Sequence, residues 1–262
     1  MKYYDSHAHY YDERFESECA TGADKLIGAL LSSSVSGIIN VGTSPDTSRL
    51  AIEEAKRHAN MYTAIGIHPS DSQYLTVTLD EALADIENLI KDAKNKCVAL
   101  GEIGLDYHYP DTDRECQMRY FEAQMTLADA LGIPVSIHDR EAHGDIMEII
   151  RRFPNVRGVL HSFSGSPEMA KELVGLGYMI SFSGTLTFTN AKRPREVAKI
   201  LPHGAVMIET DCPYLAPHPH RGKLNHSGYI EYTNRTLAEI FGITEEECAI
   251  LTEENARRFF GI

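Results

Sequence analysis

The stretch VALGEIGLDYHYPDTDRECQMRYFEAQMTLADALGIPVSI, residues 98–137, carries the pattern that decides the fold. It begins with a short apolar strand at Val98–Gly101, continues through an amphipathic segment at Arg114–Leu131, and ends in a second β-rich run at Val135–Ile137. A strand, a helix and another strand in this order are typical of a βαβ unit, whose two strands run parallel.

The same alternation runs from one end of the chain to the other. Eight β-rich runs are expected as strands: Lys2–Ser6, Gly37–Val41, Tyr62–Ile67, Val98–Gly101, Val135–Ile137, Gly158–Leu160, Met179–Phe182 and Val206–Ile208. Amphipathic segments between and after them are expected as helices, among them Asp46–His58, Leu79–Asn95, Arg114–Leu131, Pro167–Leu176, Arg195–Leu201 and Gly228–Phe241. Thr244 followed by Glu247 is a capping-box pattern, which predicts an extra C-terminal helix over Thr244–Phe259.

Eight strands, each followed by a helix, in about 250 residues fit a single α/β domain of the (β/α)8 TIM-barrel type. A doubly wound open sheet is the alternative, because alternation alone does not prove that the sheet closes. No low-complexity linker or internal repeat divides the chain, so we expect one domain over residues 1–262. Its turn-forming stretch Pro213–Tyr229 is too long for an idle connection and is expected to be a functional loop.

The overall charge limits the kinds of partner that the protein can bind. The 262 residues are 43% hydrophobic and 24% charged, and their formal net charge is -13. Such a chain is not expected to grip a nucleic-acid duplex with a broad basic surface. A phosphate substrate is still compatible with this charge, because bound divalent cations invert the local field. Any nucleic-acid contact should therefore be short and centred on the site.

The cysteines and the apolar runs bear on the compartment. Five cysteines are scattered without a C-x-x-C pair: Cys19, Cys97, Cys116, Cys212 and Cys248. This usage fits a reducing compartment better than a disulfide framework. The polar start, MKYYDSHAHYYDERF, has no signal-peptide apolar region, and no apolar run approaches membrane-spanning length. We expect a cytoplasmic protein with no membrane contact, and the sequence does not imply an obligate protein partner.

Chemically useful side chains follow the predicted strands, at the end where barrel enzymes place their active sites. In Ser6-His7-Ala8-His9 the two imidazoles at i and i+2 share one face of an extended backbone, so both can reach one cation. Four histidines and two carboxylates gather at five strand ends: His7 and His9, Glu102, His138, His161 and Asp211. Each has an ordinary structural explanation by itself, but the set favours a metal centre, in which two divalent ions share a carboxylate.

Eight segments in this order resemble the TatD family of metal-dependent deoxyribonucleases, within the amidohydrolase group of TIM-barrel hydrolases. The matching segments are DSHAHYYDERF (Asp5–Phe15), GIHP (Gly66–Pro69), GEIGLDYH (Gly101–His108), the Arg114–Gln124 helix, PVSIHDR (Pro134–Arg140), GVLHSFSG (Gly158–Gly165), ISFSGTLTF (Ile180–Phe188) and ETDCPYLAPHPHRGKLN (Glu209–Asn225). Where the family reads Asn-x-Pro after the Arg-Gly-Lys motif, this chain has Asn225-His226-Ser227, a change in a loop near the substrate.

The resemblance implies a ligand set and a role for two of its members. The implied metal ligands are His7, His9, Glu102, His138, His161 and Asp211. Glu102 would be the bridging carboxylate, and Asp211 would bind metal and accept a proton from the attacking water. Two divalent ions are expected: the imidazoles favour zinc, manganese, cobalt or nickel over magnesium, whereas the resemblance implies magnesium or manganese.

Several residues near the predicted ligands could either bind the substrate or have a structural role. His68 either donates to a substrate phosphate or is fixed by its own turn. Arg140 either clamps phosphate or, as we slightly prefer, pairs with Asp139 or Glu141. Arg221 and Lys223, in the long loop, are the best candidates for a local phosphate grip. Two more residues have expected supporting roles: Glu209 orients a ligand, and Cys212 is a buried structural thiol.

The leading hypothesis is a metal-dependent deoxyribonuclease that cleaves phosphodiester bonds with activated water, acting on single-stranded or frayed DNA ends. RNA or tRNA are alternative nucleic-acid substrates. The alternative reaction is hydrolysis of an ester or amide, such as deacylation of a D-aminoacyl-tRNA, because hydroxide attack on a carbonyl needs a similar site. A catalytically silent scaffold is disfavoured, because it would have no need of Asp211.

Overall fold

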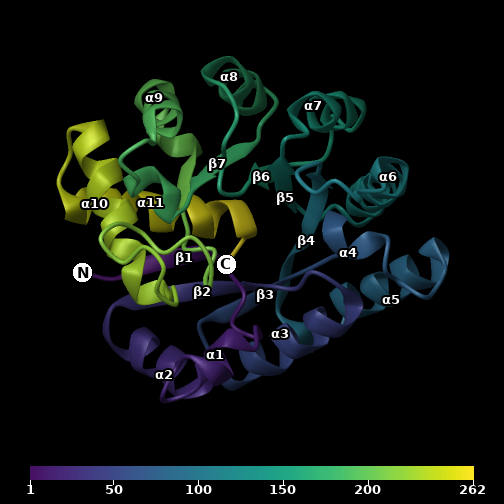
Figure 1. Ribbon diagram of the computed structural model, residues 1–262, viewed down its shortest axis with the longest axis horizontal. Helices are drawn as coiled ribbons and strands as arrows, with labels where there is room; N and C mark the ends of the chain where they lie inside the picture. The colour runs from purple at the N-terminus through teal and green to yellow at the C-terminus, as the bar shows by residue number, and fades with distance from the viewer.

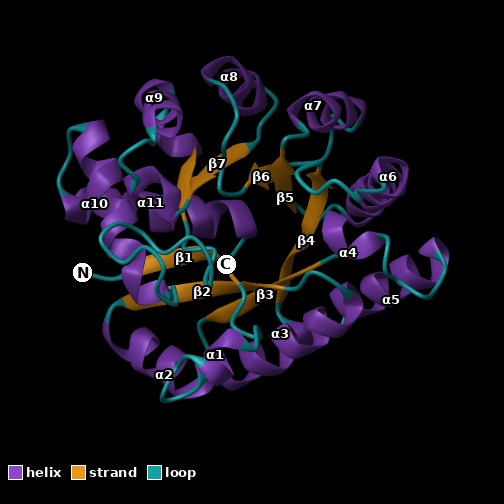
Figure 2. Cartoon of the chain, in the orientation of Figure 1, coloured by secondary structure: helices purple, strands orange, loops and turns teal.

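The computed structural model describes residues 1–262 and shows eight parallel strands in one sheet. Their order in the sheet is their order in the chain: β1 (Tyr3–Ala8), β2 (Val35–Val41), β3 (Met61–Ile65), β4 (Cys97–Asp106), β5 (Val135–Arg140), β6 (Gly158–Leu160), β7 (Met179–Phe182) and β8 (Val206–Ile208). Figure 2 shows the strands curling around a common centre, with helices outside them.

The sheet curls into a nearly closed barrel, whose two ends meet beside β1. Ala8 forms a parallel bridge with Cys212, just beyond β8. The His9 N–H donates to the Cys212 carbonyl at 2.7 Å, and the Asp211 N–H donates to the His7 carbonyl at 2.9 Å. This closure, together with the sequential strand order, confirms the TIM barrel and excludes the doubly wound sheet, whose strand order reverses at a switch point.

Helices follow the strands around the outside of the barrel (Figure 1). They are α1 (Arg14–Ser17), α2 (Ala23–Ser33), α3 (Pro45–Arg57), α4 (Pro69–Ser72), α5 (Leu79–Lys91), α6 (Arg114–Leu131), α7 (His143–Arg152), α8 (Pro167–Gly175), α9 (Lys192–Ile200), α10 (Ile230–Phe241) and α11 (Glu245–Phe260), with short 3-10 turns η1 (Ala93–Asn95), η2 (Gly184–Thr187), η3 (His203–Ala205) and η4 (Ser227–Tyr229). None combines the length and the apolar surface needed to cross a bilayer.

The extra C-terminal helix α11 is present and begins at the predicted capping box. The Thr244 hydroxyl accepts from the Glu247 N–H, while the Glu247 carboxylate accepts from the Thr244 N–H. The buried Phe259 and Phe260 of α11 pack in one cluster with residues from β1, β2, β3, β4, β6, β7 and β8. The helix therefore caps the end of the barrel interior that lies opposite the polar strand ends.

Several predicted boundaries were wrong, and two of the differences matter for the site. Strand β1 extends to Ala8 rather than Ser6, and β4 runs to Asp106 rather than Gly101, so His7 and Glu102 lie within strands. Strand β3 ends at Ile65, and His68 is the N-cap of α4. Helix α5 ends at Lys91, and η1 follows after Asp92.

Candidate metal centre

The six predicted metal ligands gather at one place, and all of them except the fully buried His7 line a cavity of about 790 Å³ inside the barrel mouth. They reach it from the ends of β1, β5, β6 and β8 and from the middle of β4. Their donor atoms form overlapping groups, and within each group these atoms lie within 4.8 Å of one another: His7, His9 and Asp211; His7, Glu102 and His161; and His68, Glu102 and His138.

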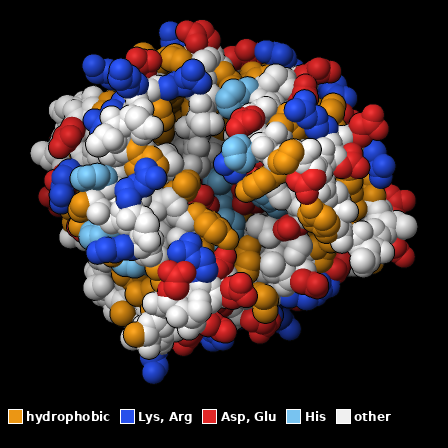
Figure 3. All heavy atoms as spheres, in the orientation of Figure 1, with side chains coloured by type: hydrophobic (Ala, Val, Ile, Leu, Met, Phe, Trp, Pro, Cys, Tyr) orange, Lys and Arg blue, Asp and Glu red, His pale blue; other side chains and the backbone are white.

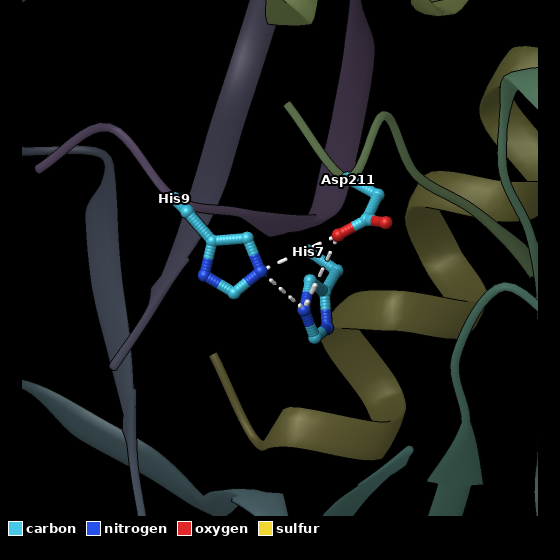
Figure 4. A group of neighbouring side chains, drawn as sticks. All are labelled: His7, His9 and Asp211. Carbon is cyan, nitrogen blue, oxygen red and sulfur yellow. Dashed lines mark hydrogen bonds and ion pairs between the residues drawn. The ribbon is translucent and has the colours of Figure 1, made fainter. Parts of the chain in front are cut away.

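The first group joins the two histidines of β1 to Asp211. The Nε2 atoms of His7 and His9 lie 3.1 Å apart, and Asp211 Oδ1 lies 3.9 Å from the first and 3.3 Å from the second. Figure 4 shows the two rings and the carboxylate pointing toward one another. Three donor atoms converge here, as the i, i+2 spacing on an extended strand requires.

Glu102 links this group to a second one through its two oxygens. Its Oε2 lies 3.4 Å from His7 Nε2 and 3.6 Å from His9 Nε2. Its Oε1 lies 2.8 Å from His138 Nδ1 and 2.7 Å from His161 Nε2. Each carboxylate oxygen therefore faces a different histidine pair, so Glu102 belongs to the donor groups on both sides.

The chemistry of the donor set fits divalent cations. Burial by itself would raise the pKa of Glu102, but the charge of His161 and the hydrogen bond with His138 hold that pKa well below its usual range. For Asp211, the hydrogen bond with His9 outweighs the effect of burial and lowers the pKa. No Lys or Arg forms an ion pair with either carboxylate. Two buried carboxylates surrounded by imidazoles can hold metal ions at these two groups.

In each histidine, the second ring nitrogen contacts another oxygen atom of the protein. Val41 O lies 2.7 Å from His9 Nδ1, and Ser136 Oγ lies 3.3 Å from His7 Nδ1. Asp106 Oδ2 lies 3.2 Å from His138 Nε2. The supporting role predicted for Glu209 agrees with the geometry, because its Oε1 lies 3.2 Å from His161 Nδ1 and accepts from the Ser162 N–H.

Sequence reasoning gave no role to Asp5 or Asp106. Asp5 is fully buried and accepts from both the N–H and the hydroxyl of Thr210, at 2.9 and 2.6 Å, which ties β1 to the residue before Asp211. Burial raises the pKa of Asp5 to about 6. The sequence did indicate that Asp106 lies near the site. It follows Glu102 by four residues, and residues four apart on a strand lie on the same face.

His68 lies at the cavity floor and is also fixed by its own turn. Its Nδ1 accepts from the Ser70 N–H at 3.1 Å, and its Nε2 lies 3.6 Å from Glu102 Oε1. Burial lowers the pKa of His68 to about 3, so the ring is neutral. Because Nδ1 accepts a hydrogen bond, the proton is on Nε2, which faces the metal centre.

The other predicted substrate-binding residues lie farther from the floor. Arg140 lines the cavity, and its guanidinium lies 5.6 Å from the Tyr109 ring. Its expected pairing with Asp139 or Glu141 was wrong, because those carboxylates bind His143 and His108. Arg221 and Lys223 do not line the cavity. Cys212 is a buried, unpaired thiol whose pKa is raised by burial, as expected for a structural residue.

The chain is similar in sequence to a known protein family. The sequence model of the family described as "TatD related DNase" matches residues 4–261. The chain belongs to the TatD family.

Individual TatD relatives match over almost the whole chain. The "uncharacterized metal-dependent hydrolase YabD" of Bacillus subtilis (strain 168) is 39% identical over 261 residues, 99% of each chain. The "uncharacterized metal-dependent hydrolase TatD" of Mycobacterium tuberculosis is 34% identical over 244 residues, 90% of each chain. The crystal structure of YjjV, a TatD homologue from Escherichia coli K12, superposes with a TM-score of 0.89 at 27% identity, covering 99% of this chain and 98% of that one. This TatD protein is therefore a metal-dependent hydrolase with the donor groups that such a hydrolase needs.

Proposed function

We propose that this TatD protein is a deoxyribonuclease that uses two divalent ions to hydrolyse phosphodiester bonds at the ends of single-stranded or frayed DNA. The observation that carries the proposal is the placement of Glu102, whose two oxygens face two separate groups of histidines. Paired metal sites that share ligands are typical of phosphatases and nucleases. The description of the family as related to a DNase supports the same substrate class.

The residues that would hold the ions are His7, His9, Glu102 and Asp211 for one, and Glu102, His138 and His161 for the other. When bound, magnesium, manganese or zinc ions would supply an acidified water and positive charge for the phosphoryl oxygens. Asp211, whose pKa is lowered, is ionised at neutral pH and can accept the proton of the attacking water. The His68 Nε2–H would donate to a phosphate oxygen, and Arg140 would meet the substrate nearer the cavity mouth.

The shape of the cavity supports action at strand ends. Its volume of about 790 Å³ is that of a small-molecule site, so it suits the end of one strand better than a duplex. Tyr109 and Tyr214 line its mouth and are about half exposed, which gives two aromatic faces on which bases can stack. The five free cysteines support our placement of this activity in the reducing cytoplasm.

The test is hydrolysis of labelled single-stranded DNA by the metal-loaded protein and by an Asp211→Asn variant. We expect the variant to be slower by about 10²- to 10⁴-fold, the usual contribution of a general base. An Asp80→Asn variant, changed in the exposed first turn of α5, is the matched control and should keep the native rate. Equal rates for the native and Asp211→Asn proteins, with and without chelator, would refute the nuclease. Faster cleavage of esters or aminoacyl-tRNA than of DNA would favour the carbonyl alternative.

A further inference from the structure

Two neighbouring segments form one wall of the cavity mouth. Thr185 lines the cavity from the segment after β7 and Pro194 from the start of α9, while Tyr214 and Leu215 line it from the segment after β8. The segments pack closely, because a Cβ atom at Gly184 would stand 2.2 Å from the Leu215 carbonyl oxygen. The His218 N–H also donates to the Thr187 hydroxyl at 2.8 Å. The two segments therefore form one continuous surface.

This wall carries exposed positive charge without ion-pair partners. The two segments and the start of α9 carry five exposed cations, which we call the basic rim: Lys192, Arg193, Arg195, Arg221 and Lys223. Of these, Arg193 lines a neighbouring hollow beside α7 and α8. None of them takes part in a salt bridge, whereas many other Lys and Arg side chains do. The Arg221 guanidinium lies 3.7 Å from the centre of the Phe188 ring, which joins the second segment to the first. This group of unpaired cations contrasts with the acidic balance of the whole chain, which has 25 basic and 38 acidic residues.

The opposite side of the mouth has the other sign of charge. Asp71 lines the cavity there, and Asp111 and Asp113 are exposed beyond it. In Figure 3 Lys and Arg side chains gather over the α9 and α10 side of the hollow, while Asp and Glu side chains predominate over the lower rim. A polyanion whose end lies at the metal centre would be repelled by one side and attracted by the other.

We propose that the basic rim is a track for the phosphate backbone of single-stranded DNA that leaves the cavity toward α9. The proposal rests on the proposed function and adds the path of the substrate to it. Cations that hold a strand in this way position it without reading its sequence. Because the rim is remote from the reacting atoms, its contacts are the same in the ground state and the transition state. They should lower KM and leave kcat unchanged.

The test compares two variants with the same loss of charge. The rim variant is K192Q/R193Q/K223Q, which leaves Arg221 on Phe188 and leaves the Arg195 hydrogen bond to the Leu186 carbonyl. The matched control is K25Q/K94Q/K171Q, whose lysines are exposed on α2, η1 and α8 and form no salt bridge. Binding of a fluorescent single-stranded oligonucleotide is measured by anisotropy over a range of salt concentrations, with Asp211→Asn added to every protein to prevent cleavage.

We expect the rim variant to bind about tenfold more weakly at low salt, while the control binds as its parent does. The slope of log affinity against log salt should fall by about 2 in the rim variant, since each phosphate contact on a single strand contributes about 0.7. With active proteins, the rim variant should raise KM for the oligonucleotide without changing kcat. The track is overturned if the rim variant binds like the control, or if the parent protein does not bind the strand.

Failure of the proposed function gives a different result. In that case the metal-loaded native protein would cleave neither the oligonucleotide nor the small phosphodiester bis(p-nitrophenyl) phosphate. The anisotropy measurement does not depend on cleavage, so it still decides whether the rim binds a strand.

Discussion

The two histidine pairs of the metal centre are held by different kinds of partner. His7 and His9, both on β1, have their outer nitrogens beside neutral oxygens, the Ser136 hydroxyl and the Val41 carbonyl. The pair from β5 and β6, His138 and His161, has its outer nitrogens beside the carboxylates of Asp106 and Glu209. A carboxylate behind an imidazole fixes the ring and makes it a more basic ligand than a neutral oxygen does.

The difference follows from how each pair is placed. The β1 pair lies on one strand, so backbone geometry alone sets the separation of the two rings. The rings of the other pair come from two strands, and carboxylates from β4 and from the end of β8 orient them. Within the β1 pair the two rings differ, because burial lowers the pKa of His7, whereas the hydrogen bond with Asp211 outweighs burial and raises the pKa of His9. In the other pair, hydrogen bonds to Asp106 and Glu102 outweigh burial and raise the pKa of His138 to about 9.

The largest expected effect comes from the residue that both pairs share. Glu102→Gln keeps the shape of the side chain but removes the negative charge that faces all four histidines. We expect hydrolysis to fall by more than about 10³-fold, because the donor groups of both histidine pairs lose the carboxylate that they share. Metal analysis of the purified variant should find less bound metal than in the native protein.

Glu54→Gln is the matched control for that change. Glu54 is a buried carboxylate that accepts from Asn40 Nδ2 at 2.8 Å and lies outside the cavity. It should keep native activity and native metal content. If Glu102→Gln also kept its metal, each histidine pair would bind metal without Glu102. The carboxylate would then not link the two pairs.

The next largest effects should come from the carboxylates behind His138 and His161. Asp106→Asn and Glu209→Gln should each weaken metal binding by about 10- to 100-fold, the usual cost of losing an outer partner of a ligand. The dependence of activity on metal concentration measures this loss. An unchanged dependence in both variants would show that the second pair needs no carboxylate to hold its rings.

Much of this centre was predictable because its ligands follow simple spacing rules. The i, i+2 histidines share a strand face, and a parallel barrel brings strand ends to one mouth, so a list of polar strand ends already gave six ligands. The partners were harder to predict, because pairing depends on which side chains meet across strands. Asp139 and Glu141 flank Arg140 in sequence, yet they contact His143 and His108.

The extent of β4 was missed for a physical reason. Gly101 and Gly104 suggested the end of a strand, since glycine weakens a strand interior. In the structure both allow β4 to lie close to β5. A Cβ atom at Gly101 would stand 2.7 Å from Ser136 Cβ, and one at Gly104 would stand 2.0 Å from the His138 carbonyl oxygen. Gly104 also has a φ of +136°, which other residues rarely adopt.

A smaller effect concerns the pH dependence of the metal-free protein. The folded pKa of His138, about 9, exceeds the ordinary value of 6.5, so the stabilisation from its charged form is complete below 6.5 and is lost as the pH rises through 9. The pKa values of His9 and His161 are also raised, so these rings add to the loss, while His7 and His68, whose pKa values are lowered by burial, stay neutral in the folded protein.

In chelator, the free energy of unfolding should therefore fall on the order of 1 kcal/mol between pH 6.5 and about 7.5, below the ordinary thiol pKa of about 8.5. Urea unfolding at several pH values measures the fall. Asp106→Asn removes one of the bonds that raise the pKa, so its stability should depend less on pH over the same range. An equal slope in the variant would show that Asp106 does not set the charge of His138.

The smallest effect on metal affinity should come from Ser136, whose hydroxyl lies beside His7 Nδ1. Ser136→Ala removes a neutral hydroxyl whose oxygen lies 3.3 Å from His7 Nδ1, a long hydrogen bond between uncharged groups. Glu102 and the stacked ring of His161, with centroids 3.9 Å apart, still hold the His7 side chain in place. We therefore expect metal affinity to change by no more than about twofold, which is small beside the loss expected for Asp106→Asn. A tenfold loss in Ser136→Ala would mean that a neutral partner orients its ring as firmly as a carboxylate does. The rings of the two pairs would then be held equally firmly, whichever kind of oxygen lies behind them.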